Sequence, residues 1–500
     1  MGGKNHPNIL FIMTDQQRYD CMGANGNSVI KTPGIDRLAE TGANFSSFFI
    51  QAPVCVPSRQ TFFSGRYPRC HKNRVNYTAM DNDVKLMQKY LQAEGYRTAF
   101  VGKLHYYPPT NDYALSTGFD YGLLHDAGPT DSQSDYVKWL RGKGINGDYR
   151  AVKKDAENPH TAILPDEYHE TTWCGEQTRS MLEKLAGEDG PFFLFSSYWK
   201  PHSSFEVPEP WASMYNRDDI ELPPRVTEDF INRLAPPVRE LALRISLRHY
   251  ELDDETRMWE YRAYYGAVSQ IDREVGLTLE CLDDLGLSDD TIVIFTSDHG
   301  DVMGERGMVD KNTFYDSAIH VPFIIKQPGK IMPGTYSDLT ESTDVLSTLF
   351  DLCGLETPYC NQGRSFAGLL TGGAAGPVYS DRDYVFAENI IPEVITSGGH
   401  DSFFVKGKGV RGILHPDAKM VRSRKWKYNY YVDYEELFDL ENDPWEMTNL
   451  ACSTEHAEVK RLHKEELLKW LVTSDEADQI APYWYSVKNA EGEWTIDKYS

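Results

Sequence analysis

The stretch of sequence that begins at residue 8 reads Asn8-Ile9-Leu10-Phe11-Ile12-Met13-Thr14-Asp15-Gln16. A short apolar run bounded by polar residues is typical of a strand that is buried on both faces of a parallel sheet. Two side chains with oxygen atoms, Asp15 and Gln16, follow the run directly. The stretch therefore predicts a central strand that delivers polar groups to the carboxyl edge of a sheet.

The same pattern recurs along the chain. Four further runs are apolar, short and bounded by polar or turn-forming residues: 97–101, 192–196, 291–297 and 321–326. Helical patterns lie between them, for example at 83–93 and 262–285. Strands that alternate with helices are typical of α/β folds. We therefore expect five buried parallel strands in a doubly wound, mostly parallel sheet flanked by helices.

Two segments depart from this alternation. Residues 201–260 are rich in proline, charged and aromatic residues, which predicts an insertion over the active face that is partly helical near 237–247. From about residue 381, short segments with Tyr, Trp, Lys and Arg predict a small antiparallel sheet, notably at 419–432. A helix is expected at 455–472. The sequence thus predicts an α/β domain at 1–380 and a small C-terminal α+β domain at 381–500.

Composition limits the functions that are open to the chain. The formal net charge is -24, with 40% hydrophobic and 25% charged residues. This balance is typical of a globular protein, and the acidic excess argues against nucleic acid and anionic membranes as partners. Residues 1–7 do not resemble a signal peptide, and no apolar run reaches the length of a membrane span. We therefore expect a cytoplasmic location. Since the eight cysteines are scattered, we expect reduced thiols at seven of them, with Cys55 as the exception.

Polar residues of a particular kind follow four of the predicted strands. These residues are Asp15 and Gln16, Lys103 and His105, Lys200 and His202, and Asp298 and His299. The carboxyl ends of parallel strands share one edge of a sheet, where ligands bind in open α/β folds. The sequence therefore predicts one site, with metal-binding and anion-binding groups, built from distant parts of the chain.

The most specific motif is Cys55-Val56-Pro57-Ser58-Arg59, followed by Ser64-Gly65-Arg66. Proline favours the first turn of a helix, and a helix N-terminus together with Arg59 would stabilise negative charge on residue 55. The segment resembles the motif of the type I sulfatases, in the alkaline phosphatase-like superfamily. This resemblance implies that a formylglycine-generating enzyme oxidises Cys55 to formylglycine, the nucleophile of that family.

Other segments extend the resemblance along most of the chain. Gly102-Lys103-Leu104-His105, Pro201-His202 and the segment at Lys311 resemble further sulfatase motifs, and Glu436-Leu437-Phe438-Asp439-Leu440 resembles a segment near the family's C-terminus. The resemblance implies a set of catalytic residues: Cys55, Arg59, Lys103, His105, His202 and Lys311. Lys103, His202 and Lys311 would neutralise the sulfate oxygens. His105 would act as a base, and Asn76 would contact the substrate.

The resemblance also implies one divalent metal ion. Its ligands would be Asp15, Gln16, Asp298, His299 and the modified Cys55. An oxygen-rich set favours Ca²⁺, whereas the histidine nitrogen favours Mn²⁺ as the alternative. Sulfatases usually carry an acidic residue where this chain has Gln16, and this departure leaves the metal identity open.

Together these observations predict hydrolysis of a small-molecule sulfate monoester to an alcohol and inorganic sulfate. The alternative is a phosphonate monoester or phosphodiester hydrolase of the same superfamily, in which uncharged residues are expected at the positions of Lys103 and His105. A binding protein without activity is disfavoured because every catalytic position holds a competent residue. The sequence identifies neither the alcohol, which could be aryl, sugar or choline, nor the oligomeric state, for which a homo-oligomer is one option.

Overall fold

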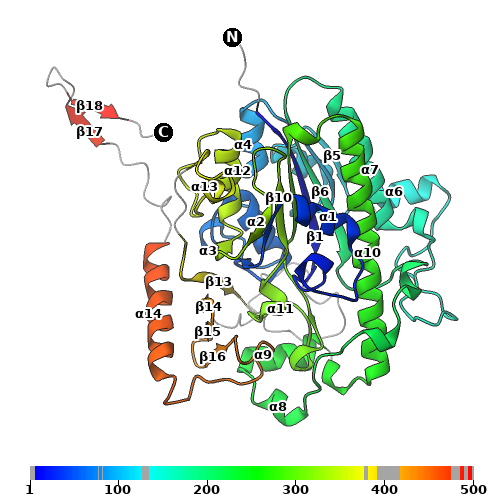
Figure 1. The fold of residues 1–500 in the computed structure, drawn as a ribbon, viewed down its shortest axis with the longest axis vertical. Helices are drawn as coiled ribbons and strands as arrows, with labels where there is room; N and C mark the ends of the chain where they lie inside the picture. The colour runs from blue at the N-terminus through cyan, green and yellow to red at the C-terminus, as the bar shows by residue number, and fades with distance from the viewer. Residues whose placement is uncertain are drawn as a thin grey trace.

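A computed structural model describes residues 6–76, 78–81, 83–126, 134–246, 248–376, 381–390, 417–474, 485–488 and 494–497. Its centre is an eight-stranded sheet with the order β11-β2-β10-β7-β1-β6-β4-β5 (Figure 1). The strands are β1 (Asn8–Asp15), β2 (Ala43–Phe45), β4 (Arg97–Gly102), β5 (Tyr121–Leu124), β6 (Phe192–Pro201), β7 (Thr291–Ser297), β10 (Phe323–Lys326) and β11 (Gly334–Tyr336).

Helices cover both faces of this sheet, as the sequence predicts (Figure 1). One face packs against α1 (Pro33–Thr41), α6 (Asp135–Gly142), α7 (Glu170–Ala186) and α10 (Asp254–Asp284). The other packs against α2 (Cys55–Ser64), α4 (Met87–Ala93) and α12 (Asp344–Cys353). Shorter elements are β3 (Phe48–Phe49), α3 (Pro68–His71), α5 (Asn111–Ser116), α11 (Asp316–Ile319), β12 (Thr340–Glu341) and α13 (Ala367–Leu370).

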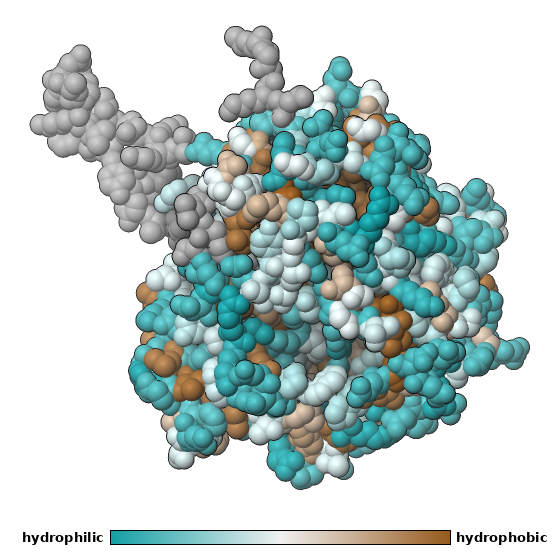
Figure 2. All heavy atoms as spheres, in the orientation of Figure 1, coloured by the Kyte–Doolittle hydropathy of each residue, from teal (hydrophilic) through white to brown (hydrophobic). Residues whose placement is uncertain are grey.

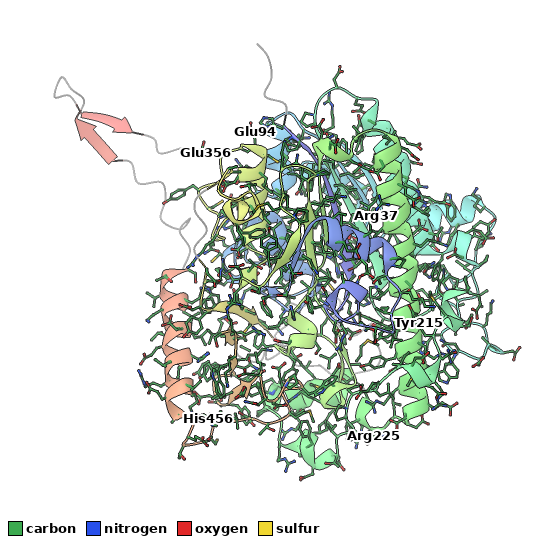
Figure 3. All side chains as sticks on the ribbon, in the orientation of Figure 1. Arg37, Glu94, Tyr215, Arg225, Glu356 and His456 are labelled. Carbon is green, nitrogen blue, oxygen red and sulfur yellow. The ribbon has the colours of Figure 1, made fainter. Side chains whose placement is uncertain are left out.

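The first strand shows why the sheet is buried on both sides. Its side chains alternate between two cores: Phe11 packs on the α2 side, whereas Leu10 and Ile12 pack on the α7 and α10 side. A strand with apolar residues at every position must bury both faces, so helices are required on each. Figure 3 shows side chains filling the space between the layers, with Arg37 of α1 forming a 3.3 Å ion pair with Asp283 of α10.

Strand direction agrees with the prediction except at one strand. β1 is parallel to β6 and β7, and β4 is parallel to β5 and β6. The prediction of a parallel strand at 321–326 is wrong, because β10 runs antiparallel to both β7 and β2. After β7 the chain forms the hairpin β8 (Val302–Met303) and β9 (Val309–Asp310), then α11. With no long crossover helix to carry the chain back to the other edge, β10 returns in the opposite direction.

The two predicted long helices are present with shifted ends. The pattern at 83–93 forms α4, which begins at Met87. The pattern at 262–285 is the second part of α10. This helix begins earlier, at Asp254, because the Asp253 side chain accepts a hydrogen bond from Thr256 N at 2.7 Å. The predicted insertion contains α8 (Glu228–Asn232), α9 (Pro236–Glu240) and a π-helical turn at Leu241–Ile245. Helix near 237–247 is therefore confirmed as far as Ile245, and residue 247 lies outside the described residues.

The C-terminal region forms the predicted antiparallel sheet. Its strands are β13 (Val385–Asn389), β14 (Ala418–Arg422), β15 (Trp426–Tyr430) and β16 (Glu435–Asp439), and the helix α14 (Ala457–Thr473) packs on it through Leu467 and Trp470. A hairpin of β17 (Tyr485–Lys488) and β18 (Trp494–Asp497) follows. The domain boundary at 380 stays a prediction, since 377–380 and 391–416 lie outside the described residues.

The surface shown in Figure 2 is mainly hydrophilic, with hydrophobic residues scattered over it. Among the described residues, no helix combines the length and the apolar character that crossing a membrane requires.

One glycine sets the distance between two strands at the carboxyl edge. Gly102, at the end of β4, has a φ of +96°, and a Cβ atom there would lie 2.0 Å from the backbone oxygen of Ser197 in β6. The next residue, Lys103, donates its backbone N–H to the same oxygen at 2.9 Å. Only glycine combines this backbone conformation with such a close approach. Gly102 thus fixes the position from which Lys103 enters the site.

We predict that Gly102→Ala lowers the free energy of unfolding by about 2 kcal/mol or more, because the new methyl group would displace β4 from β6. Thermal unfolding measures this loss. Gly142→Ala in α6 is the matched control, since a Cβ atom there meets nothing within 4 Å. Equal stability of the two variants would contradict the proposed packing.

Candidate active site

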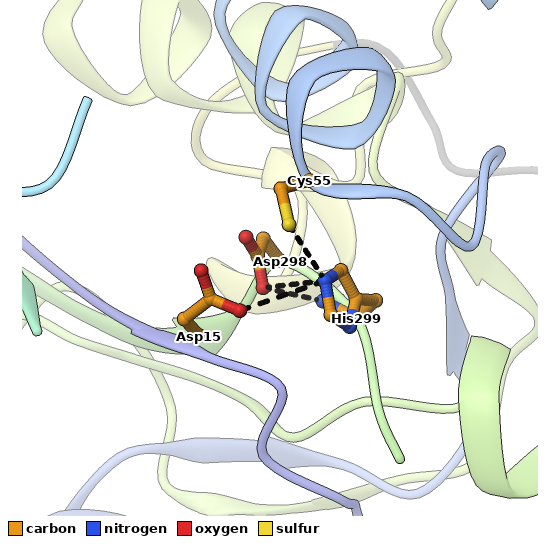
Figure 4. Close-up of side chains that lie close together, drawn as sticks. All are labelled: Asp15, Cys55, Asp298 and His299. Atoms are coloured by element: carbon orange, nitrogen blue, oxygen red, sulfur yellow. Dashed lines mark hydrogen bonds and ion pairs between the residues drawn. The ribbon is translucent and has the colours of Figure 1, made fainter. Parts of the chain in front are cut away.

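The structure brings the predicted site residues together at the carboxyl edge of the sheet. Figure 4 shows four of them, from β1, the N-terminus of α2 and the loop after β7, with their side chains pointing toward one another. These four are Asp15, Cys55, Asp298 and His299, and each is almost completely buried. The chain therefore converges on one site from segments that lie almost 300 residues apart, near Asp15 and Asp298.

Cys55 is the first residue of α2, and its Sγ atom lies 3.1 Å from His299 Nε2. Burial raises the pKa of this thiol, but the nearby charges of Lys311 and Lys103 outweigh burial and hold the pKa well below its usual value. A side-chain hydrogen bond from His105 acts in the same direction. The surroundings of residue 55 thus stabilise a negative charge on its side chain.

The four clustered side chains fit a divalent cation. Each offers one ligand atom, and these atoms all lie within 4.8 Å of one another. Opposite ligands of a bound Ca²⁺ are separated by about 5 Å, since Ca–O distances are about 2.3–2.6 Å. The buried Oδ1 atom of Asp15 has no hydrogen-bond partner among the described residues. Because His299 Nδ1 lies 2.9 Å from the Gly300 carbonyl and donates to it, the lone pair of Nε2 faces the cluster.

Charge within the cluster shifts two pKa values in opposite directions. Burial alone would raise the pKa of Asp15 and lower that of His299. For Asp15, the positive charge of Lys103 helps to bring the pKa below its ordinary value despite the opposing charge at Cys55. For His299, the carboxylate of Asp298 raises the pKa to about 9. Asp15 is therefore ionised, and a bound cation would displace the proton on His299 Nε2.

Gln16 makes three hydrogen bonds within the site. Its backbone N–H donates to Asp298 Oδ1 at 3.1 Å, its side-chain amide donates to Asp301 Oδ2 at 2.8 Å, and its side-chain oxygen accepts from Lys311 Nζ at 2.8 Å. The predicted role of Gln16 as a metal ligand stays a prediction, since its oxygen is engaged by Lys311. Sequence reasoning missed Asp301, although it lies only three residues after Asp298 in the same loop.

Arg59 and Lys103 hold the acidic residues in place. The Arg59 Nε atom donates to Asp298 Oδ2 at 2.7 Å, and Nη2 lies 3.6 Å from Asp15 Oδ2. Lys103 forms an ion pair with the same Asp15 oxygen, and its Nζ lies 3.7 Å from the centroid of the Trp199 ring. Both cations are buried. The expected role of Arg59 in stabilising negative charge on residue 55 stays a prediction.

Lys311 and His202 form a second pair beside Cys55. Lys311 Nζ donates to His202 Nε2 at 2.6 Å, and His202 Nδ1 donates to the Ser203 carbonyl. Burial, followed by the charge of Lys311, lowers the pKa of His202. Burial would also lower the pKa of Lys311, yet Asp310 and the site's other negative groups raise it. The pair therefore consists of a lysine cation and a neutral histidine.

The remaining predicted residues lie around this centre. His105 has a φ of 60°, and its backbone N–H donates to both Asp126 carboxylate oxygens at 3.0 Å, a contact that sequence reasoning missed. Asn76 Oδ1 accepts from Val56 N at 3.0 Å, so Asn76 caps the first turn of α2. Its substrate contact stays a prediction. Lys200 pairs instead with Glu206 at 2.8 Å, away from the cluster.

A mostly parallel α/β sheet carries a buried cluster of possible metal ligands and several cations at its carboxyl edge, and this arrangement fits a hydrolase of the alkaline phosphatase-like class. The family model named Sulfatase matches residues 7–355, and the chain therefore belongs to the sulfatase family. It is accordingly a sulfuric ester hydrolase.

Individual proteins are also similar to this chain over most of its length. An arylsulfatase of Clostridium perfringens is 30% identical over 495 residues, covering 94% of this chain and 95% of that protein. A choline-sulfatase of Rhizobium meliloti is 28% identical, covering 89% and 82%. The solved structure of a phosphonate monoester hydrolase from Silicibacter pomeroyi has a TM-score of 0.82 at 25% identity, covering 98% of this chain and 99% of that chain.

We predict that Asp15→Asn and Asp298→Asn each lower the bound divalent metal at least about tenfold, because each removes an anionic ligand from one cation. Elemental analysis of the purified variants gives the occupancy. Asp289→Asn, an exposed carboxylate before β7, serves as the control and should keep the metal content of the unmodified chain. Unchanged metal in both site variants would place the cation elsewhere.

Proposed function

We propose that the chain hydrolyses sulfate monoesters to an alcohol and inorganic sulfate, and that a formylglycine-generating enzyme first oxidises Cys55 to formylglycine. The observation that carries the proposal is the position of Cys55. It starts α2 with its sulfur directed at His299 in the acidic cluster, and Lys103, Lys311, His105 and His202 lie around it. An anionic nucleophile and an anionic substrate could both be stabilised there.

The proposed cofactor is one divalent cation, Ca²⁺ with Mn²⁺ as the alternative, held by Asp15, Asp298, His299 and residue 55. Three of these positions offer oxygen atoms once residue 55 is formylglycine, which favours a hard cation. The cation would supply positive charge that polarises the sulfate and acidifies a hydroxyl group at residue 55.

Formylglycine would supply a hydrated aldehyde whose hydroxyl group attacks sulfur. Lys103 and Lys311 would neutralise the oxygens of the sulfate, because their positive charges act on residue 55 and hold the pKa of the Cys55 thiol low. Lys311 would also stabilise the departing alcohol oxygen, while neutral His202 holds its ammonium group at 2.6 Å. His105, which hydrogen-bonds to residue 55, would accept the proton of the second hydroxyl group while the C–O bond to sulfate breaks, so that sulfate leaves and the aldehyde forms again.

A phosphonate monoester hydrolase activity is the second candidate. It is favoured by the TM-score of 0.82 with a phosphonate monoester hydrolase over almost the whole chain. Lys103 argues for sulfate as the better substrate. A sulfate monoester offers three peripheral oxygens to cations, whereas a phosphonate monoester has carbon at one position. A fully buried lysine that faces this neutral substituent would lose part of its electrostatic partner.

We predict a higher kcat/KM for an aryl sulfate than for a phenylphosphonate ester with the same leaving group, pH and metal. Lys103→Ala should narrow this gap about 100-fold, because deleting one stabilising donor costs about 3 kcal/mol in the transition state of the sulfate reaction. Steady-state kinetics on both esters measures the ratio.

Two controls accompany this comparison. Lys154→Ala removes an exposed lysine and should leave both rates unchanged. Cys55→Ala should fold normally and hydrolyse neither ester, since no other residue supplies the nucleophile. If the unmodified chain hydrolyses the phosphonate ester with the higher kcat/KM, the second candidate function is favoured. An active Cys55→Ala variant would refute the proposed nucleophile.

A further inference from the structure

A buried carboxylate beside the site has no part in the chemistry proposed above. Asp301 is 0% exposed, and both of its oxygens accept hydrogen bonds: Oδ1 from Asp310 N at 3.0 Å and Oδ2 from the Gln16 side-chain amide at 2.8 Å. Arg18 donates to the backbone oxygen of Asp301 at 3.1 Å, while its charge pairs with Asp20 and Glu305. The side-chain partner of Asp301 is therefore an amide.

The Gln16 amide lies between two groups with opposite hydrogen-bonding capacity. Lys311 Nζ can only donate, and it lies 2.8 Å from Gln16 Oε1. Asp301 Oδ2 accepts from Gln16 Nε2 at 2.8 Å. Rotating the amide by half a turn would set its NH₂ group against the lysine and its carbonyl against the carboxylate. Only one orientation of this amide satisfies both neighbours.

We infer that Asp301 is a positioning residue that turns the Gln16 side-chain carbonyl toward Lys311, and that Asp301 is the reason position 16 holds an amide. This inference rests on the proposed metal-dependent hydrolysis for its functional meaning. The hydrogen bonds run from the Asp310 backbone through Asp301 and Gln16 to Lys311, which in turn reaches His202 at 2.6 Å. Asp301 thus acts on the reacting groups through Gln16.

Each single substitution in this pair would create a conflict. Q16E would place the introduced carboxylate against that of Asp301 at a fully buried position, where like charges cannot both ionise without a large cost. D301N creates the reverse conflict. The introduced amide has one side-chain oxygen, which the fixed backbone N–H of Asp310 would take, and its NH₂ group would then face the NH₂ group of Gln16.

Combining the two substitutions restores the pairing of hydrogen-bond donors with acceptors between positions 16 and 301. In Q16E/D301N, the carboxylate at position 16 would accept from both Lys311 and the amide at position 301, and the oxygen of that amide would accept from Asp310 N. The pair also keeps the same total charge as Gln16 with Asp301. Reciprocal rescue of this kind is specific to a direct contact, since distant substitutions add independently.

The test is a double-mutant cycle on the full chain, with Q16E, D301N and Q16E/D301N. Thermal unfolding in excess chelator should show that each single variant is less stable than the unmodified chain and that the double variant recovers most of the loss. This measurement needs neither metal nor turnover, so its outcome is independent of the proposed function. A double variant whose loss equals the sum of the two single losses would overturn the inference.

Turnover of an aryl sulfate at saturating metal is the second readout. Each single variant should lower kcat about tenfold with a smaller change in KM, because misplacing Lys311 affects the transition state most, and the double variant should regain about tenfold. The control Q16E/D289N leaves Asp301 in place and should show no recovery. Stability rescue without kcat rescue would overturn the positioning role and leave only a structural contact.

Discussion

The site depends on one buried ion pair, between Arg59 Nε and Asp298 Oδ2 at 2.7 Å. Arg59 lies in α2 one turn after Cys55, and Asp298 follows β7. The same guanidinium donates through Nη1 to the Lys103 carbonyl at 2.8 Å and to Ser197 Oγ at 2.9 Å. One side chain therefore fixes the helix that carries residue 55 relative to the ends of β4, β6 and β7. Its planar, multidentate geometry suits this role, which lysine could not fill.

Each buried charged side chain of the site depends on an oppositely charged neighbour to offset the cost of its burial. Desolvating an isolated carboxylate or ammonium costs several kcal/mol, and removing one partner of a buried pair leaves that cost uncompensated. The negative charges of Asp15 and Asp298 offset the positive charges of Arg59 and Lys103. Lys311 lowers the pKa of Cys55, and its ammonium group is held by hydrogen bonds to Gln16 and His202. The result is a positive environment beside two buried carboxylates that could hold a metal ion. Such an arrangement can stabilise a bound cation and an anionic substrate side by side without reorganisation.

Much of the fold could be predicted from short apolar runs, because a strand that is apolar at every position needs helices on both faces. The direction of β10 could not, since it depends on the connection after β7 and not on the residues of the strand itself. The convergence of strand-end residues was predictable for a related reason. Parallel strands share one carboxyl edge, so Asp15, Lys103 and Asp298 had to meet there.

Side-chain direction was harder to predict than strand position. Lys103 follows β4, whereas Lys200 lies near the end of β6, which runs on to Pro201. Lys103 pairs with Asp15 and Lys200 with Glu206. Sequence position alone does not distinguish them, because a single residue of offset changes the direction in which a side chain points. Asp301 was missed because an aspartate in a strand-end loop is common. Its importance depends on facing Gln16, a residue 285 positions earlier in the chain.

The proposed chemistry depends on residue 55 supplying the nucleophile as formylglycine. The most direct test is mass spectrometry of the peptide that contains residue 55, from protein whose aryl sulfate turnover has been measured. We expect a peptide with an aldehyde in place of the thiol, and turnover that rises in proportion to the fraction converted. Full activity in protein whose Cys55 is entirely an unmodified thiol would contradict it.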